Sequence, residues 1–369
     1  MPSSIIDFYN RQSYKVAKIV DQTFFQLLLD DTSIFQRIAP VQNYVDTALL
    51  IMRMSRSKPT IASLVGDEQE LPNSRSRVKL SEETLSEARI GKQHVFTNND
   101  FKAFKKFQEA VERAAQPSLV KQFEEVFFGI AADLAPAIIE KMTVLLMEVL
   151  TTGSCNYTDP LTKVKMVLSY DEVISSGVNQ LMFTAAPISQ DDWGAITANG
   201  LATLETDAMS HYRNFGTFPP TMYMRWNLMR DLANQTSTKR AVAERRGYGL
   251  ETEASINAMY IEDQEVLDLI RQRTRGSAVE FLDSMYSEEA ESGVITDKYF
   301  LDDKRYFFAA DGNAERSFVP TPERDFQPGI YTKAKEIDDA PRIERIAGVG
   351  AGIPTVFDAR KLAARRVKI

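Results

Sequence analysis

The chain has 369 residues, of which 44% are hydrophobic and 26% charged, a composition typical of globular proteins and not of disordered ones. Its formal charge of −7 argues against a dedicated nucleic-acid-binding protein, because such proteins normally carry a basic excess. A single cysteine, Cys155, excludes an intramolecular disulfide and favours a reducing compartment. No apolar run approaches the ~18 residues of a membrane span, and the N-terminus lacks the pattern of a signal peptide. We expect a soluble, cytoplasmically made protein with roughly two or three domains.

The N-terminal part contains segments with little apolar surface for a core of their own. Residues 1–50 combine short helical patterns with apolar clusters such as 23–29, and they are expected to form an arm that packs on something else. Within 53–95, a strand at 59–65, a turn-rich tip at 66–74 and a return with strand-like alternation predict a long hairpin. Long loops in compact domains are usually functional or disordered, so we expect this one to rest on another subunit. A plain solvated loop is the alternative.

One long helix is predicted over residues 118–152. Ser118 suits its beginning and Gly153 its end. Pro136 must kink or split the helix, because proline removes a backbone hydrogen bond and clashes with the preceding turn. Apolar residues beyond a narrow stripe, such as Leu146, indicate that more than one face is buried. The positions with helical spacing are Phe123, Phe127, Ile130, Leu134, Ile138, Leu145 and Val149.

The other predicted elements are short, and most lie in the C-terminal two thirds of the chain. Helices are expected at 98–107, at 189–200 with a second helix from there to about Tyr212, and at 227–232. A turn is expected at 155–160, with strands at 161–169, 220–226, 305–310 and 329–332, further elements at 266–270 and 277–282, and a basic terminal segment at 355–369.

Residue types that carry protein chemistry are few and scattered. His94 and His211 are the only histidines, with Cys155 between them in the sequence. A zinc site needs several such ligands at helical or turn spacing, which this chain lacks. Neither a Gly-x-Ser-x-Gly nucleophile elbow nor a Gly-x-x-x-x-Gly-Lys-Ser/Thr phosphate loop occurs. We predict structural histidines and an incidental thiol; a cysteine–histidine or serine–histidine pair assembled by the fold is the alternative.

Two further patterns favour a structural interpretation. The run from Gly348 to Gly352 is similar to a phosphate-binding loop, but Pro354 interrupts it at once, so a flexible turn before the last strand is predicted. Adjacent side chains on a helix do not face each other, so acidic doublets fit solvated faces or helix N-termini better than paired catalytic carboxylates. Asp191 and Asp192 are predicted in a first helical turn. The doublets are Glu124-Glu125, Asp191-Asp192, Asp302-Asp303 and Asp338-Asp339.

A basic cluster lies near the C-terminus. It could contact phosphate, but in an acidic chain we favour pairing with an acidic patch on a neighbouring subunit. No catalytic, cofactor-binding or metal-binding residue is predicted anywhere in the chain, and no cofactor. The cluster consists of Arg360, Lys361, Arg365, Arg366 and Lys368.

Several stretches together carry a resemblance to a known family. They run from Gly91 to Asp100, from Leu134 to Gly153 with the turn at 156–160, from Trp193 to Gly200, and from Pro220 to Leu232. With the order of arm, charged loop, long helix, turn, strand and mixed region, these stretches resemble the tailed-phage major capsid proteins, in particular the phage lambda-type family. The likeness spans most of residues 53–240.

The resemblance implies an α+β protein with the Hong Kong 97 capsid fold and no enzymatic activity. It implies an N-terminal arm (1–52), an extended loop (53–96), a peripheral domain with a spine helix (97–190 and 335–369) and an axial domain (191–334). The implied function is self-assembly into hexamers and pentamers of an icosahedral head shell. The shell would enclose packaged DNA without sequence-specific binding and would be assembled in the host cytoplasm.

The resemblance also implies partners and leaves alternatives open. The expected partners are further copies of the chain, a portal, a separate scaffolding protein and cement proteins, with no membrane. An encapsulin-like cargo compartment with the same fold is one alternative. A soluble α+β enzyme with substrate near the aromatic residues of 305–331 is the other, and it predicts a small oligomer with a deep pocket.

Overall fold

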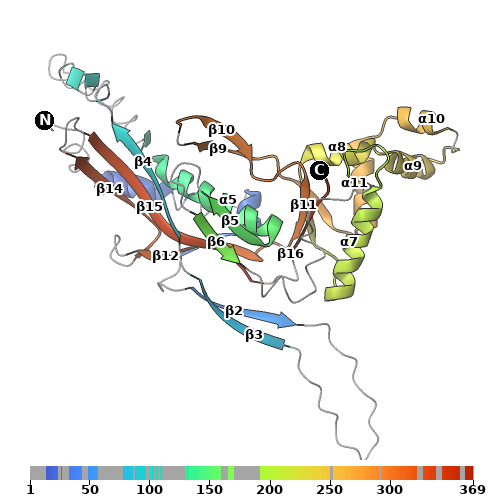
Figure 1. Ribbon diagram of the computed structural model, residues 1–369, viewed down its shortest axis with the longest axis horizontal. Helices are drawn as coiled ribbons and strands as arrows, with labels where there is room; N and C mark the ends of the chain where they lie inside the picture. Colours follow the sequence, from blue (N-terminus) through green and yellow to red (C-terminus); the bar gives the residue numbers. More distant parts are fainter. Residues whose placement is uncertain are drawn as a thin grey trace, which may run out of the picture. The chain divides into compact units, whose positions relative to one another are not determined.

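The structure of the protein is a computed structural model, and Figure 1 colours it along the sequence. Contacts divide the chain into two compact units. The first unit comprises residues 1–50, 84–144 and 315–355, and the second comprises 51–83, 145–314 and 356–369. The described residues are 14–23, 26, 33–43, 49–56, 78–85, 88–96, 100, 102–103, 105–106, 109, 129–130, 132–158, 165–169, 192–249, 252–290, 292–321, 327–337, 343–357 and 362–368.

The first unit is built on a six-stranded sheet with the order β1-β12-β15-β14, in which β4 also pairs with β15 and β13 with β12. β1 runs parallel to β12, whereas β4 and β14 are antiparallel to β15. Residues 14–23 are helical, and helix α2 (Ile34–Ile38) leads into β1. The strands are β1 (Val41–Asn43), β4 (Ala88–Phe96), β12 (Ala314–Thr321), β13 (Gln327–Pro328), β14 (Ile330–Ile337) and β15 (Ile343–Val356).

Helix α5 (Leu134–Thr152) confirms the C-terminal part of the predicted long helix, and residues 118–128 of that prediction lie outside the described residues. Leu146 is fully buried, so the expected burial of more than one face is confirmed. Gly153 ends the helix as predicted, with a left-handed φ of 76° and its N–H donating to the Val149 carbonyl at 2.8 Å. The stripe residues Leu134, Ile138, Leu145 and Val149 are all buried.

Pro136 lies in the first turn of α5, just after an interruption of the helical stretch. Residues 129, 130 and 132 are helical, Asp133 forms a turn, and Pro136 is the third residue of α5. In the first turn of a helix, the backbone N–H has no intrahelical acceptor, so proline costs nothing there. Of the two predicted outcomes, a kink or a split, the chain takes the split.

The predicted flexible turn at residues 348–352 is wrong, because these residues lie in the middle of strand β15. Three glycines at alternate positions share one face of the strand, which comes close to α5. A Cβ added at Gly352 would lie 2.5 Å from the Ser317 carbonyl oxygen, and one at Gly348 would lie 2.8 Å from a helix side chain. The glycines are therefore required for close packing of helix on sheet. The helix residues that would meet Cβ atoms at Gly348, Gly350 and Gly352 are Leu134, Ile138 and Met142.

The second unit contains a four-stranded sheet in the order β16-β11-β7-β8 and three two-stranded pairs, β2–β3, β5–β6 and β9–β10. Its sheet strands are β7 (Thr221–Met224), β8 (Ala278–Phe281), β11 (Arg305–Ala309) and β16 (Leu362–Arg366). The paired strands are β2 (Leu49–Arg56), β3 (Val78–Leu85), β5 (Ser154–Thr158), β6 (Lys165–Ser169), β9 (Met285–Glu289) and β10 (Ile295–Tyr299). The helices are α7 (Gly200–Phe215), α8 (Trp226–Asn234), α9 (Thr236–Arg245), α10 (Glu253–Ala258) and α11 (Asp263–Arg273).

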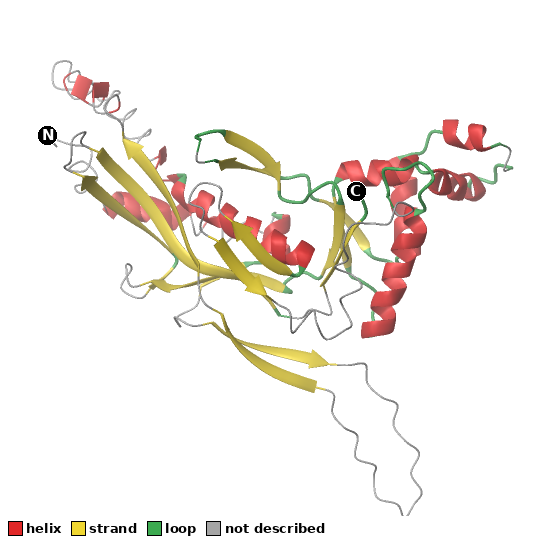
Figure 2. Ribbon diagram, viewed as in Figure 1, coloured by secondary structure: helices red, strands yellow, loops and turns green. Residues whose placement is uncertain are grey.

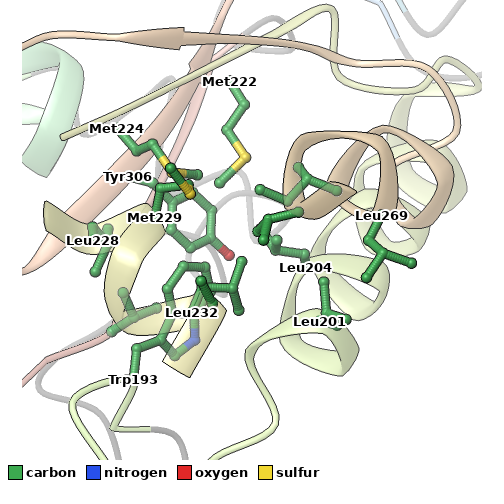
Figure 3. Packing of buried hydrophobic residues seen from close by; sticks show 14 of the residues in the cluster. Trp193, Leu201, Leu204, Met222, Met224, Leu228, Met229, Leu232, Leu269 and Tyr306 are labelled. Carbon is green, nitrogen blue, oxygen red and sulfur yellow. The ribbon is translucent and has the colours of Figure 1, made fainter. Parts of the chain in front are cut away.

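The core of the second unit lies between this sheet and helices α7, α8 and α11, and Figure 3 shows its side chains converging. β11 is a central strand, paired with β16 on one side and β7 on the other. Tyr306, Phe307 and Phe308 are all fully buried, as expected for a strand covered on both faces. Labelled core residues are Trp193, Leu201, Leu204, Met222, Met224, Leu228, Met229, Leu232, Leu269 and Tyr306.

Most predicted elements of this unit are confirmed. β7 followed by α8 matches 220–232, α7 matches the second helix after Gly200, and α11, β8 and β11 match 266–270, 277–282 and 305–310. The Asn199 side chain caps α7, accepting from the Ala202 N–H at 3.3 Å. β6 at 165–169 confirms the end of the strand predicted for 161–169, whose beginning lies outside the described residues.

Two local predictions in this unit are wrong. The turn expected at 155–160 is strand β5 up to Thr158, because this segment finds a pairing partner in β6. Residues 193–197 form turns instead of a helix, so Asp192 is not in a first helical turn. Its carboxylate accepts from the Gly194 N–H at 3.0 Å, a local bond that competes with helix formation.

Candidate functional site

The residues considered for chemistry lie on three different elements of the structure. Cys155 is buried in β5, with its Sγ 3.7 Å from a carboxylate oxygen of Glu148. His211 is buried in α7, where its Nδ1 lies 2.7 Å from the Thr217 carbonyl oxygen, and His94 is an exposed residue of β4. Within the described ranges, no three His, Cys, Asp or Glu side chains are placed to hold a metal ion. No helix there is long and apolar enough to span a membrane.

Two of the C-terminal basic residues, Arg365 and Lys368, pair with acids of their own chain, so the predicted pairing with a neighbouring subunit is wrong for these two. Lys368 Nζ lies 2.8 Å from an Asp231 carboxylate oxygen and 3.7 Å from one of Asp303. Arg365 Nη1 lies 2.5 Å from an Asp207 oxygen. The cause is strand β16, which joins the edge of the sheet beside β11 and brings these side chains to the acids of α7, α8 and the loop before β11. Arg360 and Lys361 lie outside the described residues.

Asp207 is the polar centre of the second unit. One of its carboxylate oxygens accepts from the Tyr306 hydroxyl and the other from Arg365, so one side chain joins α7, β11 and β16. Asp207 is 5% exposed and Tyr306 is fully buried. Burial, followed by the neighbouring Asp207 charge, raises the pKa of Tyr306 well above its ordinary value. The phenol therefore stays protonated and donates, and the arginine neutralises the buried carboxylate.

Beside this centre, the amide of Gln235 joins a turn to a helix start. Its oxygen accepts from the Gly200 N–H at 2.8 Å, and its nitrogen donates to the Trp193 carbonyl at 3.2 Å. Gly200 is required here, since a Cβ would lie 2.4 Å from Leu232 and 2.9 Å from the indole of Trp193. The first turn of α7 is thus fixed against α8 and the loop before it.

Arg316 has a comparable role in the first unit. It is 4% exposed on β12, and its guanidinium donates to the Ala39 carbonyl at 3.0 Å, to Thr143 Oγ1 at 2.9 Å and to Gln36 Oε1 at 2.7 Å. All three acceptors are neutral, and burial lowers the pKa of Arg316 to about 10. One arginine therefore ties the N-terminal segment at 36–39 to β12 and α5.

Asp207 and Arg316 were not among the predicted functional residues, although each has a detectable signal in the sequence. Asp207 falls on the face of α7 that also carries Leu204 and His211, where a charge is unexpected. Arg316 alternates with Phe318 along β12 and so shares its buried face. A charged residue at a core-facing position indicates a buried polar network before its partners are known.

The β9–β10 hairpin, drawn as two yellow strands in Figure 2, is exposed along the whole of β10. All five residues of β10 are exposed, and neither strand pairs with another described strand. One face packs inward, with Tyr286 half-buried and against Phe300, and Glu288 paired with Lys298 at 2.7 Å. The opposite face presents Ile295, 66% exposed, to solvent. A two-stranded ribbon of this kind gains stability from a partner.

The stability of this hairpin should depend on pH in the alkaline range. Burial, with smaller effects of Glu288 and Glu148, raises the pKa of Tyr286 to about 12. A raised pKa in the folded state means that the stabilisation is complete below pH ~10 and is lost as the pH rises toward 12. Tyr286→Phe should therefore flatten the fall in the free energy of unfolding between pH 10 and 11.5, measured in urea.

The control is Tyr260→Phe, which removes the hydroxyl of a tyrosine that is 74% exposed. If wild type and Tyr286→Phe lose stability in parallel across this pH interval, the Tyr286 phenol is not the group responsible.

Comparison with known proteins concerns the fold. No protein-family model matches the chain, and no curated protein matches it in sequence. Among solved structures, it is similar to the putative capsid protein of a prophage from E. coli CFT073, at 14% identity over 97% of this chain and 98% of that one, with a TM-score of 0.53. The chain has the fold of a phage capsid protein.

Two further solved structures align over comparable lengths with lower TM-scores. The satellite phage P4 procapsid with its size determination protein shares 9% identity over 95% of this chain and 100% of that one, with a TM-score of 0.46. A virus-like particle from Pyrococcus furiosus shares 7% identity over 94% of this chain and 98% of that one, with a TM-score of 0.41. The similarity to the prophage protein confirms the expected α+β capsid fold.

Proposed function

We propose that the protein is the major capsid protein of a tailed phage, which self-assembles into hexamers and pentamers of an icosahedral head shell around packaged DNA. The observation that supports this most is the agreement of the fold with the putative prophage capsid protein over 97% of this chain and 98% of that one. The chain would act by packing against copies of itself, without catalysis and without a cofactor. Its location would be the virion capsid, after assembly in the host cytoplasm.

The parts of the chain would divide the work of assembly. In this proposal residues 1–52 are the arm, 53–96 the extended loop, 97–190 and 335–369 the peripheral domain, and 191–334 the axial domain. The two-stranded ribbons β2–β3 and β9–β10 support an assembling role, because such ribbons are marginal alone and gain buried area from a neighbour. A portal, a separate scaffolding protein and cement proteins would be the other partners.

Electron microscopy and sedimentation of the purified full chain test this function. Closed shells or hexameric and pentameric capsomers are the expected result. A discrete small oligomer that turns over a substrate would contradict it and support an α+β enzyme. Shells that enclose a protein cargo, encoded beside no terminase or portal gene, would contradict the phage assignment and support an encapsulin-like compartment.

A further inference from the structure

Arg275 occupies a backbone position that normally requires glycine. Among the described residues other than glycine, it alone has a positive φ, at 60°. It follows α11 in a Schellman motif, in which the Gly276 N–H donates to the Arg271 carbonyl at 2.8 Å and the Arg275 N–H to the Gln272 carbonyl at 3.3 Å. An arginine here is strained where glycine would not be, and retained strain points to a role for the side chain.

Arg271 precedes Arg275 by four residues at the end of α11, and Arg245 shares an acidic partner with Arg271. Arg245 and Arg271 both approach the same carboxylate, Asp268, at 3.9 and 3.8 Å, with about half of each arginine side chain exposed. Arg275 is exposed, and no ion pair found among the described side chains includes it. The arginine cluster, defined as Arg245, Arg271 and Arg275, therefore carries more positive charge than its own chain neutralises.

The outward face of the β9–β10 hairpin has the complementary character. Strand register places Ile295 opposite Glu289, and Asp297 opposite Ser287, on that face. Glu289 and Asp297 are exposed, and the single lysine of the hairpin, Lys298, is engaged with Glu288. Ile295 supplies apolar area between the two carboxylates. An acidic face with an apolar centre suits the stems and heads of arginine side chains.

Within one chain these two surfaces lie before and after the edge strand β8. Arg275 precedes the strand and the hairpin follows it, and a four-residue strand is about 13 Å long. In Figure 1 the hairpin also extends away from α9 and α10. Two different, complementary surfaces on separate sides of one subunit are the requirement for a head-to-tail contact, which closes into a ring when the rotation permits.

We infer that the arginine cluster of one subunit binds the outward face of the β9–β10 hairpin of the adjacent copy within a capsomer. This rests on the proposed capsid function and adds a specific contact to it. The salt bridges form in the assembly, so the strain at Arg275 is offset only there. Charge pairs of this kind fix the register between copies and speed their association.

Arg275→Gly separates a role in assembly from a role in folding. Glycine relieves the positive φ, so the unassembled chain should melt about 2 °C higher or more, followed by tryptophan fluorescence. The same variant should need about tenfold more protein to form capsomers, measured by sedimentation, because it lacks the guanidinium. Arg275→Gly with a lower melting temperature, or with unchanged assembly, would overturn the inference.

A charge swap tests the partner. Arg275→Glu and Glu289→Lys should each impair capsomer formation about tenfold or more, and the double variant should recover most of the loss. Arg213→Glu, at an exposed arginine on α7, makes the same change in net charge as Arg275→Glu and should assemble like wild type. If wild-type capsomers form and the double variant is no better than either single one, the hairpin is not the partner. A wild-type chain that forms no capsomers overturns the proposed function as well.

Discussion

Asp207→Ala should lower the free energy of unfolding of the second unit by about 3 kcal/mol, since removal of one partner leaves a buried charge and a buried hydroxyl without their acceptor. Arg365 remains beside the core, with a side chain that is 23% exposed, and Tyr306 remains fully buried. The partial exposure of Arg365 places the expected cost at the lower end of the range for buried pairs. Both tryptophans, Trp193 and Trp226, belong to this unit, so fluorescence in urea reports its unfolding.

The matched control removes the whole network. The triple variant Asp207→Leu, Arg365→Met and Tyr306→Phe replaces three polar groups with apolar ones of similar size, which is often close to neutral. It should therefore be more stable than Asp207→Ala alone. If the single variant unfolds at the wild-type urea concentration, the carboxylate is not needed to hold α7, β11 and β16 together.

Gly352→Ala should destabilise the first unit by about 2–3 kcal/mol, because its Cβ has no room. That atom would lie 2.5 Å from the backbone carbonyl of Ser317, which cannot rotate away as a side chain can. Gly348→Ala, 2.8 Å from Leu134 Cβ, should cost less, and Gly350→Ala, 3.1 Å from the ring of Phe318, least. The three variants thus form a graded series along one strand face.

Hydrogen exchange of the β15 amides is the suitable measurement, because neither tryptophan lies in the first unit. Gly129→Ala is the control, since a Cβ there meets nothing within 4 Å and alanine favours a helix. Equal effects at all three strand positions would show that the loss of glycine flexibility, and not contact with α5 and β12, sets the cost.

The three central features differ in how visible they are in the sequence. The apolar stripe of α5 can be predicted from the sequence because its buried positions recur within one or two turns of the same helix. For Asp207 and Arg316 the sequence indicates only that a charged residue lies at a core-facing position. Their partners are 158 and up to 280 residues away in the chain, and such distances leave no local pattern. The proposed assembly contact could not be predicted from the sequence, because Arg275 is distinguished only by its positive φ in the structure.

Two of the local errors have one cause. Residues 348–352 carry glycines and residues 155–158 an asparagine, residue types that turns favour, yet both segments are strands. In β15 the glycines leave room for the side chains of α5, and in β5 the segment pairs with β6. Propensity is a difference of about 1 kcal/mol per residue at most, which ladder hydrogen bonds and packing exceed.

The sequence by itself determined the elements with a clear apolar pattern: α5 with its glycine stop, β7 with α8, and strand β11 with its unbroken apolar run. It also supported the resemblance to capsid proteins, through the order of those elements. Only the tertiary structure decided which charges are buried and paired, where glycine is required for close packing, and which faces stay open. These depend on contacts between residues far apart in the chain, and their energies are set by burial that no single segment possesses.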